Sequence, residues 1–143
     1  MTAPRIQIKR LLRRKSSGEV IRVDSDKEIA KIRIRMNIRY KPIDRPRADS
    51  MNVFFTCKMS DASEDETNPA NPLEAIVEII YQAVFADTYD VKNIDIDSIM
   101  HFLWPYLRES AALQLQQIGL GKVAQDLPYV VPDKGDKDGQ PNE

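Results

Sequence analysis

Apolar and polar side chains alternate strictly along residues 32–41, which is the clearest local pattern in the chain. The apolar positions are Ile32, Ile34, Met36, Ile38 and Tyr40, and the positions between them are charged or polar. A period of two places successive side chains on opposite faces of a strand, so we predict a half-buried antiparallel strand here. Alternation resumes from Met51 to Met59 after a turn-rich stretch that contains Pro42 and Pro46. These two segments are predicted to pair.

The segment Leu73–Ala86 is apolar at almost every position. Its spacing also permits a helix, but its β-branched and aromatic residues favour a strand. As a strand, one face would carry Ala75, Val77, Ile79, Tyr81, Ala83 and Phe85. The other face would carry Ile76, Ile80 and Val84, interrupted by Glu78 and Gln82. A strand that is apolar on both faces must be covered twice or leave apolar surface open.

The regions around these strands have weaker patterns. Residues 5–13 alternate and predict a first strand, which Val20–Val23 would extend after a turn at Ser16–Gly18. Residues 60–72 are acidic and contain proline, as a surface loop does. Residues 127–132 predict a short extended apolar piece. The polar residues 133–143 are expected to form a disordered tail after a single domain of residues 1–132.

From Asp95 the hydrophobic period changes to three and four, which predicts an amphipathic helix. The repeating apolar positions are Ile96, Ile99, Leu103, Tyr106 or Leu107, and Leu113. Pro105 lies inside this pattern, so we expect a kinked helix or two helical pieces. Gly119 and Gly121 are expected to end the helix.

Charge is divided unevenly along the chain. Residues 1–47 contain 15 Lys or Arg and 5 Asp or Glu, whereas residues 48–143 contain 6 and 17. Such a division indicates either an anionic partner for the first third or neutralisation within the fold or between subunits. Because the basic residues alternate with apolar ones and do not form a tail, we favour neutralisation.

Composition argues against several classes of chemistry. The single cysteine, Cys57, excludes an intramolecular disulfide and a cysteine-based zinc site, and reads as a buried small hydrophobe. The single histidine, His101, leaves little for a metal site or a catalytic triad. No glycine-rich phosphate loop or nucleophile motif is present. We therefore expect a protein that is not an enzyme and has no cofactor, metal or catalytic residue.

The sequence also bears on location. It begins without an apolar signal-peptide core, and no stretch approaches the ~20 apolar residues that span a bilayer. A soluble, cytoplasmic protein without membrane insertion is the expectation.

The helical segment Phe102–Glu109, FLWPYLRE, resembles the helix motif of SecB-type chaperones, where an aromatic-Pro-Tyr tripeptide precedes Arg-Glu. Gln7–Arg10 resembles the family's opening strand, and Ile76–Ile79 resembles a later one. The likeness covers about residues 5–132. It implies an α+β fold, in which a four-stranded antiparallel sheet carries a long kinked helix on one face. It also implies a homo-oligomer built as a dimer of dimers.

The resemblance further implies an ATP-independent holdase that binds unfolded polypeptides in apolar grooves between sheet and helix. Exporting members of that family deliver clients to the SecA motor through exposed acidic residues, which Glu19 and Glu78 match here. Lys15 stands where the family has an aspartate, and this charge reversal would weaken attraction to a basic partner. Residues 133–143 also replace the family's C-terminal helix. The chain is therefore expected to be a divergent member, with an antitoxin or SecA as candidate partners.

We select candidate client-binding residues from the apolar positions that the pattern does not clearly assign to the core. They are Phe54, Ile76, Ile80, Val84 and Trp104. The three aliphatic residues could equally form a subunit interface, Phe54 could pack beneath a loop, and Trp104 could belong to the core. Tyr106, Arg108 and Glu109 are assigned to an oligomer interface or a structural role, with Arg108 and Glu109 as an ion pair.

The main alternative function is nucleic-acid binding. Arg33, Arg35 and Arg39 share one strand face, and a positive face can follow a phosphate backbone. Aromatic residues for base stacking are absent from this face except for Phe54. A structural module that binds one folded partner through the same face is a further alternative.

Overall fold

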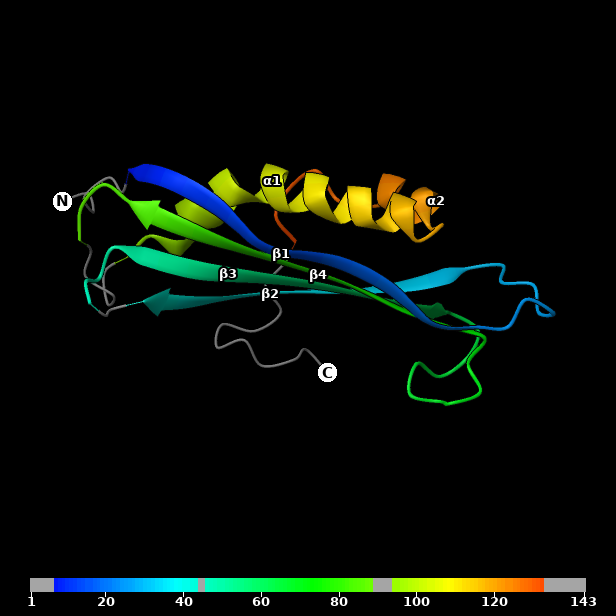
Figure 1. Ribbon diagram of the computed structural model, residues 1–143. Coiled ribbons are helices and arrows are strands. Elements are labelled where there is room, and N and C mark those ends of the chain that lie inside the picture. Colours follow the sequence, from blue (N-terminus) through cyan, green and yellow to red (C-terminus); the bar gives the residue numbers. More distant parts are fainter. Residues whose placement is uncertain (1–6, 44–45, 89–93, 133–143) are drawn as a thin grey trace.

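The computed structural model describes residues 7–43, 46–88 and 94–132. The elements are β1 (Ile8–Val23), β2 (Ile32–Ile43), β3 (Ser50–Asp61), β4 (Leu73–Phe85), α1 (Ile96–Gln117) and α2 (Gly121–Gln125). The four strands form one antiparallel sheet in the order β1-β4-β3-β2, so β1 and β2 are its edges. Both helices lie on the same side of the sheet (Figure 1). The predicted tail, residues 133–143, and the predicted strand start at residues 5–6 lie outside the described residues.

Strand alternation decides which side chains enter the core. Ile38 of β2 lies opposite Phe55 of β3, which lies opposite Ile79 of β4, and all three are buried. The predicted division of β4 into two faces is confirmed, because its odd-numbered residues are buried and its even-numbered residues are half-buried. Helix α1 covers the odd-numbered face, where Trp104 meets Phe55 edge to face with ring centroids 5.4 Å apart. Such an aromatic pair adds about 0.5–1.5 kcal/mol to its burial.

The predicted turn at Ser16–Gly18 is wrong, because β1 is one continuous strand of 16 residues. Its pairing with β4 continues through this stretch, with a register shift between Arg13 and Lys15. Gly18 lies directly under α1, where an added Cβ would approach Ile118 Cγ2 to 3.2 Å. Small residues at this point therefore allow the helix to lie close to the strand, and do not form a turn.

Strand β2 also runs further than predicted, because it includes Pro42 and ends at Ile43. Pro42 cannot donate a backbone hydrogen bond, but an edge strand tolerates this loss. The predicted turn stretch is therefore shorter than residues 42–50. The edge position of β2, which the local sequence does not reveal, explains the difference.

Helix α1 is continuous over 22 residues and contains Pro105, so the alternative of two helical pieces is wrong. Pro105 is exposed, and the carbonyl that its missing N–H leaves unpaired belongs to His101, which is also exposed. Of the two alternatives for the buried position, Leu107 is correct, because Tyr106 is 45% exposed. Leu113, the last position of the predicted apolar repeat, is also 45% exposed.

Both ends of α1 carry well-formed caps. Asp95 accepts hydrogen bonds from the backbone N–H and the hydroxyl of Ser98. The Ser98 hydroxyl, and then its N–H, hold the pKa of Asp95 below its usual value. At the other end, the Leu120 N–H donates to the Leu115 carbonyl and Gly119 has φ of 85°, a Schellman arrangement. Gly119 thus ends α1 as predicted, whereas Gly121 begins α2.

The two glycines after α1 provide a matched test of this cap. Gly119→Ala should lower the free energy of unfolding by about 1–2 kcal/mol, because a side chain is strained at positive φ. Gly121→Ala should be neutral or slightly stabilising, because Gly121 lies in a helix and the added Cβ has ordinary contacts. Urea unfolding followed by circular dichroism measures both. Equal effects of the two substitutions would contradict the cap.

Candidate functional site

The sheet face opposite α1 carries apolar side chains that neither helix covers (Figure 1). Ile76, Ile80 and Val84 of β4 are half-buried on this face, and Phe54 of β3 lies directly opposite Ile80. We call Phe54, Ile76, Ile80 and Val84 the open sheet face. Four of the five predicted client-binding residues thus lie together on one surface.

Phe54 has a charged neighbour on this surface. The Arg39 guanidinium of β2 lies 5.5 Å from the centroid of the Phe54 ring, and the two residues are paired across the strands. A cation over an aromatic face at an exposed site contributes about 0.5–1 kcal/mol. Arg39, one of the three predicted phosphate-binding residues, is therefore engaged with an aromatic ring.

Lys15 and Glu78 form an ion pair beside the open sheet face. The Lys15 Nζ atom lies 3.2 Å from Glu78 Oε1, and the side chains are 45% and 43% exposed. Glu19, the other predicted docking residue, is exposed and lies opposite Ile76. Glu78, one of the two predicted docking acids, is thus neutralised by Lys15.

The ion pairs of the described residues reveal how the uneven charge is balanced. They are Lys15–Glu78, Arg22–Glu74, Arg35–Glu66 and Arg47–Asp49. Each joins a base from residues 1–47 to an acid from residues 48–143. For these residues, the predicted neutralisation within the fold is confirmed.

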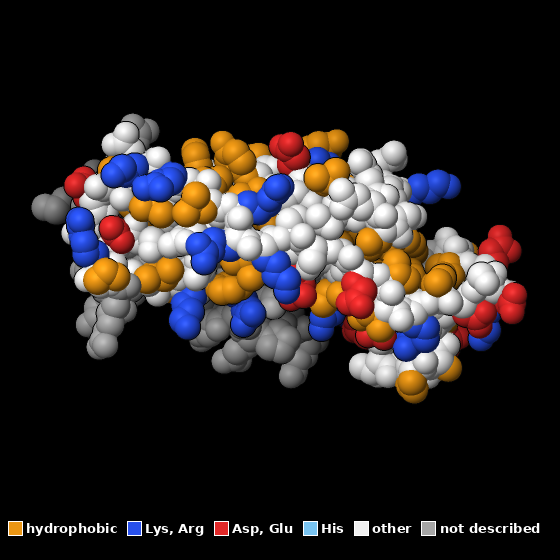
Figure 2. Space-filling model, in the orientation of Figure 1, with side chains coloured by type: hydrophobic (Ala, Val, Ile, Leu, Met, Phe, Trp, Pro, Cys, Tyr) orange, Lys and Arg blue, Asp and Glu red, His pale blue; other side chains and the backbone are white. Residues whose placement is uncertain are grey.

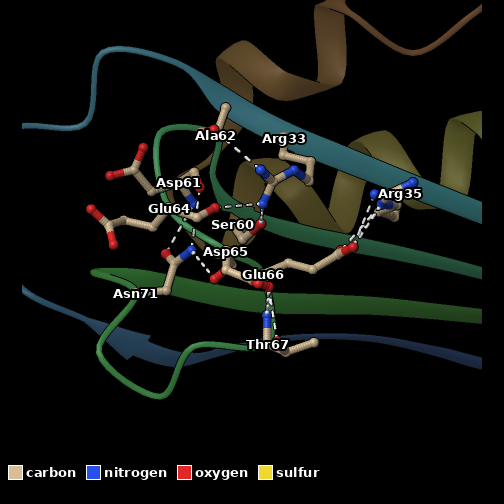
Figure 3. Close-up of polar contacts among 10 residues, drawn as sticks. All are labelled: Arg33, Arg35, Ser60, Asp61, Ala62, Glu64, Asp65, Glu66, Thr67 and Asn71. Atoms are coloured by element: carbon tan, nitrogen blue, oxygen red, sulfur yellow. Dashed lines mark hydrogen bonds and ion pairs between the residues drawn. The ribbon is translucent and has the colours of Figure 1, made fainter.

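The loop at residues 62–72 lies on the side of the sheet away from α1 and is held by two arginines of β2 (Figures 1 and 3). Arg33 donates to the carbonyl oxygens of Ala62 and Glu64 at 3.1 and 2.9 Å, and to the Ser60 hydroxyl. Arg35 forms an ion pair with Glu66 at 3.0 Å. The basic strand face is therefore largely occupied by the protein's own loop.

Asn71 organises this loop from within. Its side chain is buried, accepts from the backbone N–H groups of Asp61 and Leu73, and donates to the carbonyl oxygens of Asp61 and Asp65. Arg22 of β1 donates to the Asn71 carbonyl at 2.7 Å. The loop is thus fastened from both edges of the sheet. Sequence reasoning did not identify Asn71, because the path of the loop that returns it to Asp61 and Asp65 is not visible in the sequence.

A second candidate surface, with both apolar and basic residues, lies between β1 and α1. This β1–α1 groove has a volume of about 470 Å³ and is lined by Ile8, Lys9, Arg10, Leu11, Arg13, Tyr81, Phe102 and Tyr106. The rings of Phe102 and Tyr106 lie 5.8 Å apart and are 49% and 45% exposed. Sequence reasoning missed Phe102, although its spacing of four from Tyr106 places both on one helix face.

Trp104, predicted to bind clients, lies in the core. It is 2% exposed, and its Nε1 donates to the Pro128 carbonyl at 3.0 Å. Its client-binding role is therefore corrected to a structural one. The indole presents no surface to a bound segment, because its ring packs on Phe55 and its Nε1–H already donates to the Pro128 carbonyl.

Arg108 has a structural position, as one of its predicted alternatives stated. It donates to the carbonyl oxygens of Leu127 and Pro128, and its guanidinium lies 4.1 Å from the centroid of the Tyr129 ring. The expected ion pair with Glu109 does not form, because adjacent helix residues point in different directions. Arg108 fastens the segment after α2 to α1, whereas Glu109 is exposed.

The remaining reactive groups of the described residues have ordinary surroundings. Burial raises the pKa of the Cys57 thiol to about 12, so the thiol is protonated at neutral pH. The His101 ring lies at the surface, with Nδ1 2.7 Å from the Asp97 carbonyl oxygen. The described ranges contain no group of three or more His, Cys, Asp or Glu arranged for a metal ion. Within them, neither helix is long and apolar enough to cross a membrane.

No protein-family model matches the chain, and no curated protein matches its sequence. Among solved structures, the chain is similar to the SecB-like chaperone Rv1957 of Mycobacterium tuberculosis, in complex with a ChAD peptide from the HigA1 antitoxin Rv1956. The TM-score is 0.52 over 90% of this chain and 89% of that one, with 16% sequence identity. The chain has a SecB-like fold. The four-stranded sheet with a long helix on one face, expected from the FLWPYLRE motif, is confirmed.

The two arginines that hold the loop differ in burial, which allows a test of the SecB-like sheet's basic edge. Arg33→Ala should lower the free energy of unfolding by about 1–3 kcal/mol, because carbonyl groups lose charged donors. Arg35→Ala should cost under about 1 kcal/mol, because its ion pair is exposed. Urea titration of both variants measures the difference. Equal stability of Arg33→Ala and the unmodified protein would show that these bonds are unimportant.

Proposed function

We propose that the chain is a subunit of an ATP-independent chaperone that holds unfolded polypeptide segments and has no enzymatic activity. The observation that carries this proposal is the open sheet face on a SecB-like fold. Four apolar residues there remain half-buried because both helices lie on the other side. Half-buried apolar side chains on a sheet face that no helix covers indicate an interaction site, here with charged residues between them.

The chemistry of this surface suits unfolded segments. Ile76, Ile80 and Val84 alternate with Glu78 and Gln82, so apolar side chains lie beside polar ones along one strand. An extended client also alternates its side chains, and tolerant apolar pockets accept many sequences. Holding varied segments requires no nucleotide and no metal.

We further propose that the subunits assemble into a homo-oligomer, with a dimer of dimers as the expected form, in the cytoplasm. Tyr106 and Glu109 are exposed on α1, where a second subunit could pack. Both sheet edges, β1 and β2, also lack a neighbouring strand within the described part of the chain. These are the surfaces that an assembly would use.

The client or delivery partner follows from the charges beside the open sheet face. The similar Rv1957 structure contains an antitoxin peptide, which supports an antitoxin as a client of this chain as well. SecA is the less favoured partner, because Lys15 neutralises Glu78 and leaves Glu19 as the other matching acid.

Nucleic-acid binding by the basic strand face is less well supported. Arg33 and Arg35 bond to the loop at residues 62–72, and Arg39 lies over Phe54. Phosphate groups would have to compete with these contacts. Binding of a labelled oligonucleotide that is tight and steeply salt-dependent would reverse this preference.

The holdase proposal predicts that stoichiometric protein suppresses aggregation of a chemically denatured client without ATP. Ile80→Asp should weaken this suppression several-fold, because a carboxylate in the centre of the open sheet face opposes apolar contact. Light scattering measures both the aggregation and the mass of the assembly. Loss of suppression at unchanged mass would place clients on this face, and loss of mass would assign the face to the subunit interface.

Val23→Asp is the control for this experiment. Val23 is a branched apolar residue at the end of β1 and is 60% exposed, so the same type of change should leave suppression intact. An unmodified protein that is monomeric and fails to suppress aggregation would refute the proposed function.

The ion pair at Lys15 predicts weak attraction to SecA. Lys15→Asp should raise the affinity for SecA several-fold, because it removes the cation from Glu78 and adds a second carboxylate beside it. Lys15→Gln should give a smaller increase, since it removes the cation alone. Calorimetric titration in low salt measures both. Strong SecA binding by the unmodified chain would show that the ion pair does not prevent docking.

A further inference from the structure

We propose that the sheet face opposite α1 docks an acidic, extended segment of a partner protein along β2 and β3. Glu66, from the protein's own loop at residues 62–72, occupies part of this place in the unbound chain. This inference rests on the proposed chaperone function and adds the chemistry of a delivery partner. It is carried by the outward side chains of β2 and β3, whose charges differ from those of β4.

The side chains that β2 and β3 turn away from α1 are basic or uncharged. They stand at the odd-numbered positions of β2 and the even-numbered positions of β3, and none of them in these two described strands is acidic. Arg33 is committed to carbonyl groups of the loop. The exposed cations that remain are Arg35, Arg39, Lys41 and Lys58, which we call the basic strip.

Two cations of the basic strip stand directly opposite each other. Arg35 of β2 is paired with Lys58 of β3, and like charges at such positions repel. The Glu66 carboxylate lies 3.0 Å from Arg35, and its side chain lines the same small hollow as Lys58 (Figure 3). The chain thus already holds one peptide carboxylate on the strip. Because the Arg35–Glu66 pair is exposed and contributes little, an incoming carboxylate can exchange with Glu66.

The rest of the strip has no carboxylate partner. Arg39, Lys41 and Lys58 form no ion pair within the described ranges of the chain. Arg39 lies over the Phe54 ring, and a contact of this kind leaves guanidinium N–H groups available as donors. A strand rises about 3.3 Å per residue, so Arg39 and Lys41 lie about 13 and 20 Å along β2 from Arg35. An extended peptide has the same rise and alternation, so its acidic side chains can meet all three.

A peptide suits the strip better than a nucleic acid does. Phe54, the ring beside the strip, has Arg39 over it and offers little to a stacked base. Figure 2 shows basic side chains along the side away from α1, while acidic ones gather mainly at the end that holds the loop, where they would repel a longer phosphate backbone. A second subunit at the β2 edge would pair with backbone groups in the plane of the sheet. The strip stands perpendicular to that plane and would stay accessible.

The experiment uses three fluorescent peptides of about ten residues, in which Thr alternates with Glu, Gln or Lys. They contain no large apolar residue, so the open sheet face contributes little to their binding. Anisotropy titration of the full chain should give an affinity for the Glu peptide at least about tenfold above that for the Gln peptide. The Lys peptide should bind most weakly. The preference should shrink as salt is raised, because the strip is exposed.

Charge reversal of the strip is the decisive variant. Arg39→Glu combined with Lys41→Glu should abolish the preference for the Glu peptide, because two of the cations that meet its carboxylates are replaced by acids. Lys27→Glu combined with Lys122→Glu is the control, because it changes the net charge equally at exposed residues outside the strip. The control should keep the preference. Its loss in both variants would show that net charge alone attracts the peptide, and would overturn the proposal.

Glu66→Gln tests the competition between the loop and the partner. It should raise the affinity for the Glu peptide several-fold, because it frees Arg35. Glu64→Gln removes the same charge from the same loop, and the Glu64 carboxylate forms no ion pair within the described residues. It should therefore give a smaller increase. Equal affinities of these two variants would show that Glu66 does not occupy the docking place.

Aggregation assays on the same preparations separate this inference from the proposed function. Suppression of aggregation without preference for the Glu peptide would overturn the inference and leave the holdase function standing. Preference without suppression would support the docking surface and refute the holdase function. A single-stranded oligonucleotide that binds more tightly than the Glu peptide, and is lost on reversal of Arg39 and Lys41, would refute the acidic partner. A fall in mass of that variant at unchanged peptide preference would assign the strip to a contact between copies, and would refute it as well.

Discussion

The structure depends on a mismatch between one strand that is apolar on both faces and helices that cover a single face. β4 lies inside the sheet between β1 and β3, and its odd-numbered residues form the centre of the core under α1. Its even-numbered aliphatic residues have no helix above them. Burying a side chain such as Ile80 would contribute roughly 1.5–3 kcal/mol, so the uncovered face retains a driving force for binding.

Charge neutralisation within the fold determines much of the remaining surface. Arg22, Arg33 and Arg35 reach the loop at residues 62–72 from the two opposite edges of the sheet. This network turns an acidic loop and a basic strand face into one folded unit. This network neutralises charge at only one end of the sheet. The first half of β1 stays basic, beside the one exposed aromatic pair of α1.

The sequence predicted those features that depend on local period. Alternation identified β2 and β3, β-branched and aromatic content identified β4, and the glycine signal placed the end of α1 at Gly119. The predictions that failed depend on distant partners. Ser16–Gly18 has turn chemistry, but pairing with β4 and the approach of α1 override it. Tyr106 and Leu107 are adjacent on the helix, so a period of three or four alone could not decide which one is buried.

Candidate sites were predictable to the same limited degree. The aliphatic residues Ile76, Ile80 and Val84 share a face because strand geometry requires it. The position of Phe54 beside them, and the Lys15–Glu78 pair, require the order of strands in the sheet. A structural likeness at 16% sequence identity shows a shared backbone fold, and does not show that the surface charges are shared. In this chain the helix keeps the FLWPYLRE motif, while β1 carries both the lysine beside Glu78 and the unneutralised cations of the groove. The charge pattern of this edge strand can therefore change without disturbing the core, because its charged side chains are exposed.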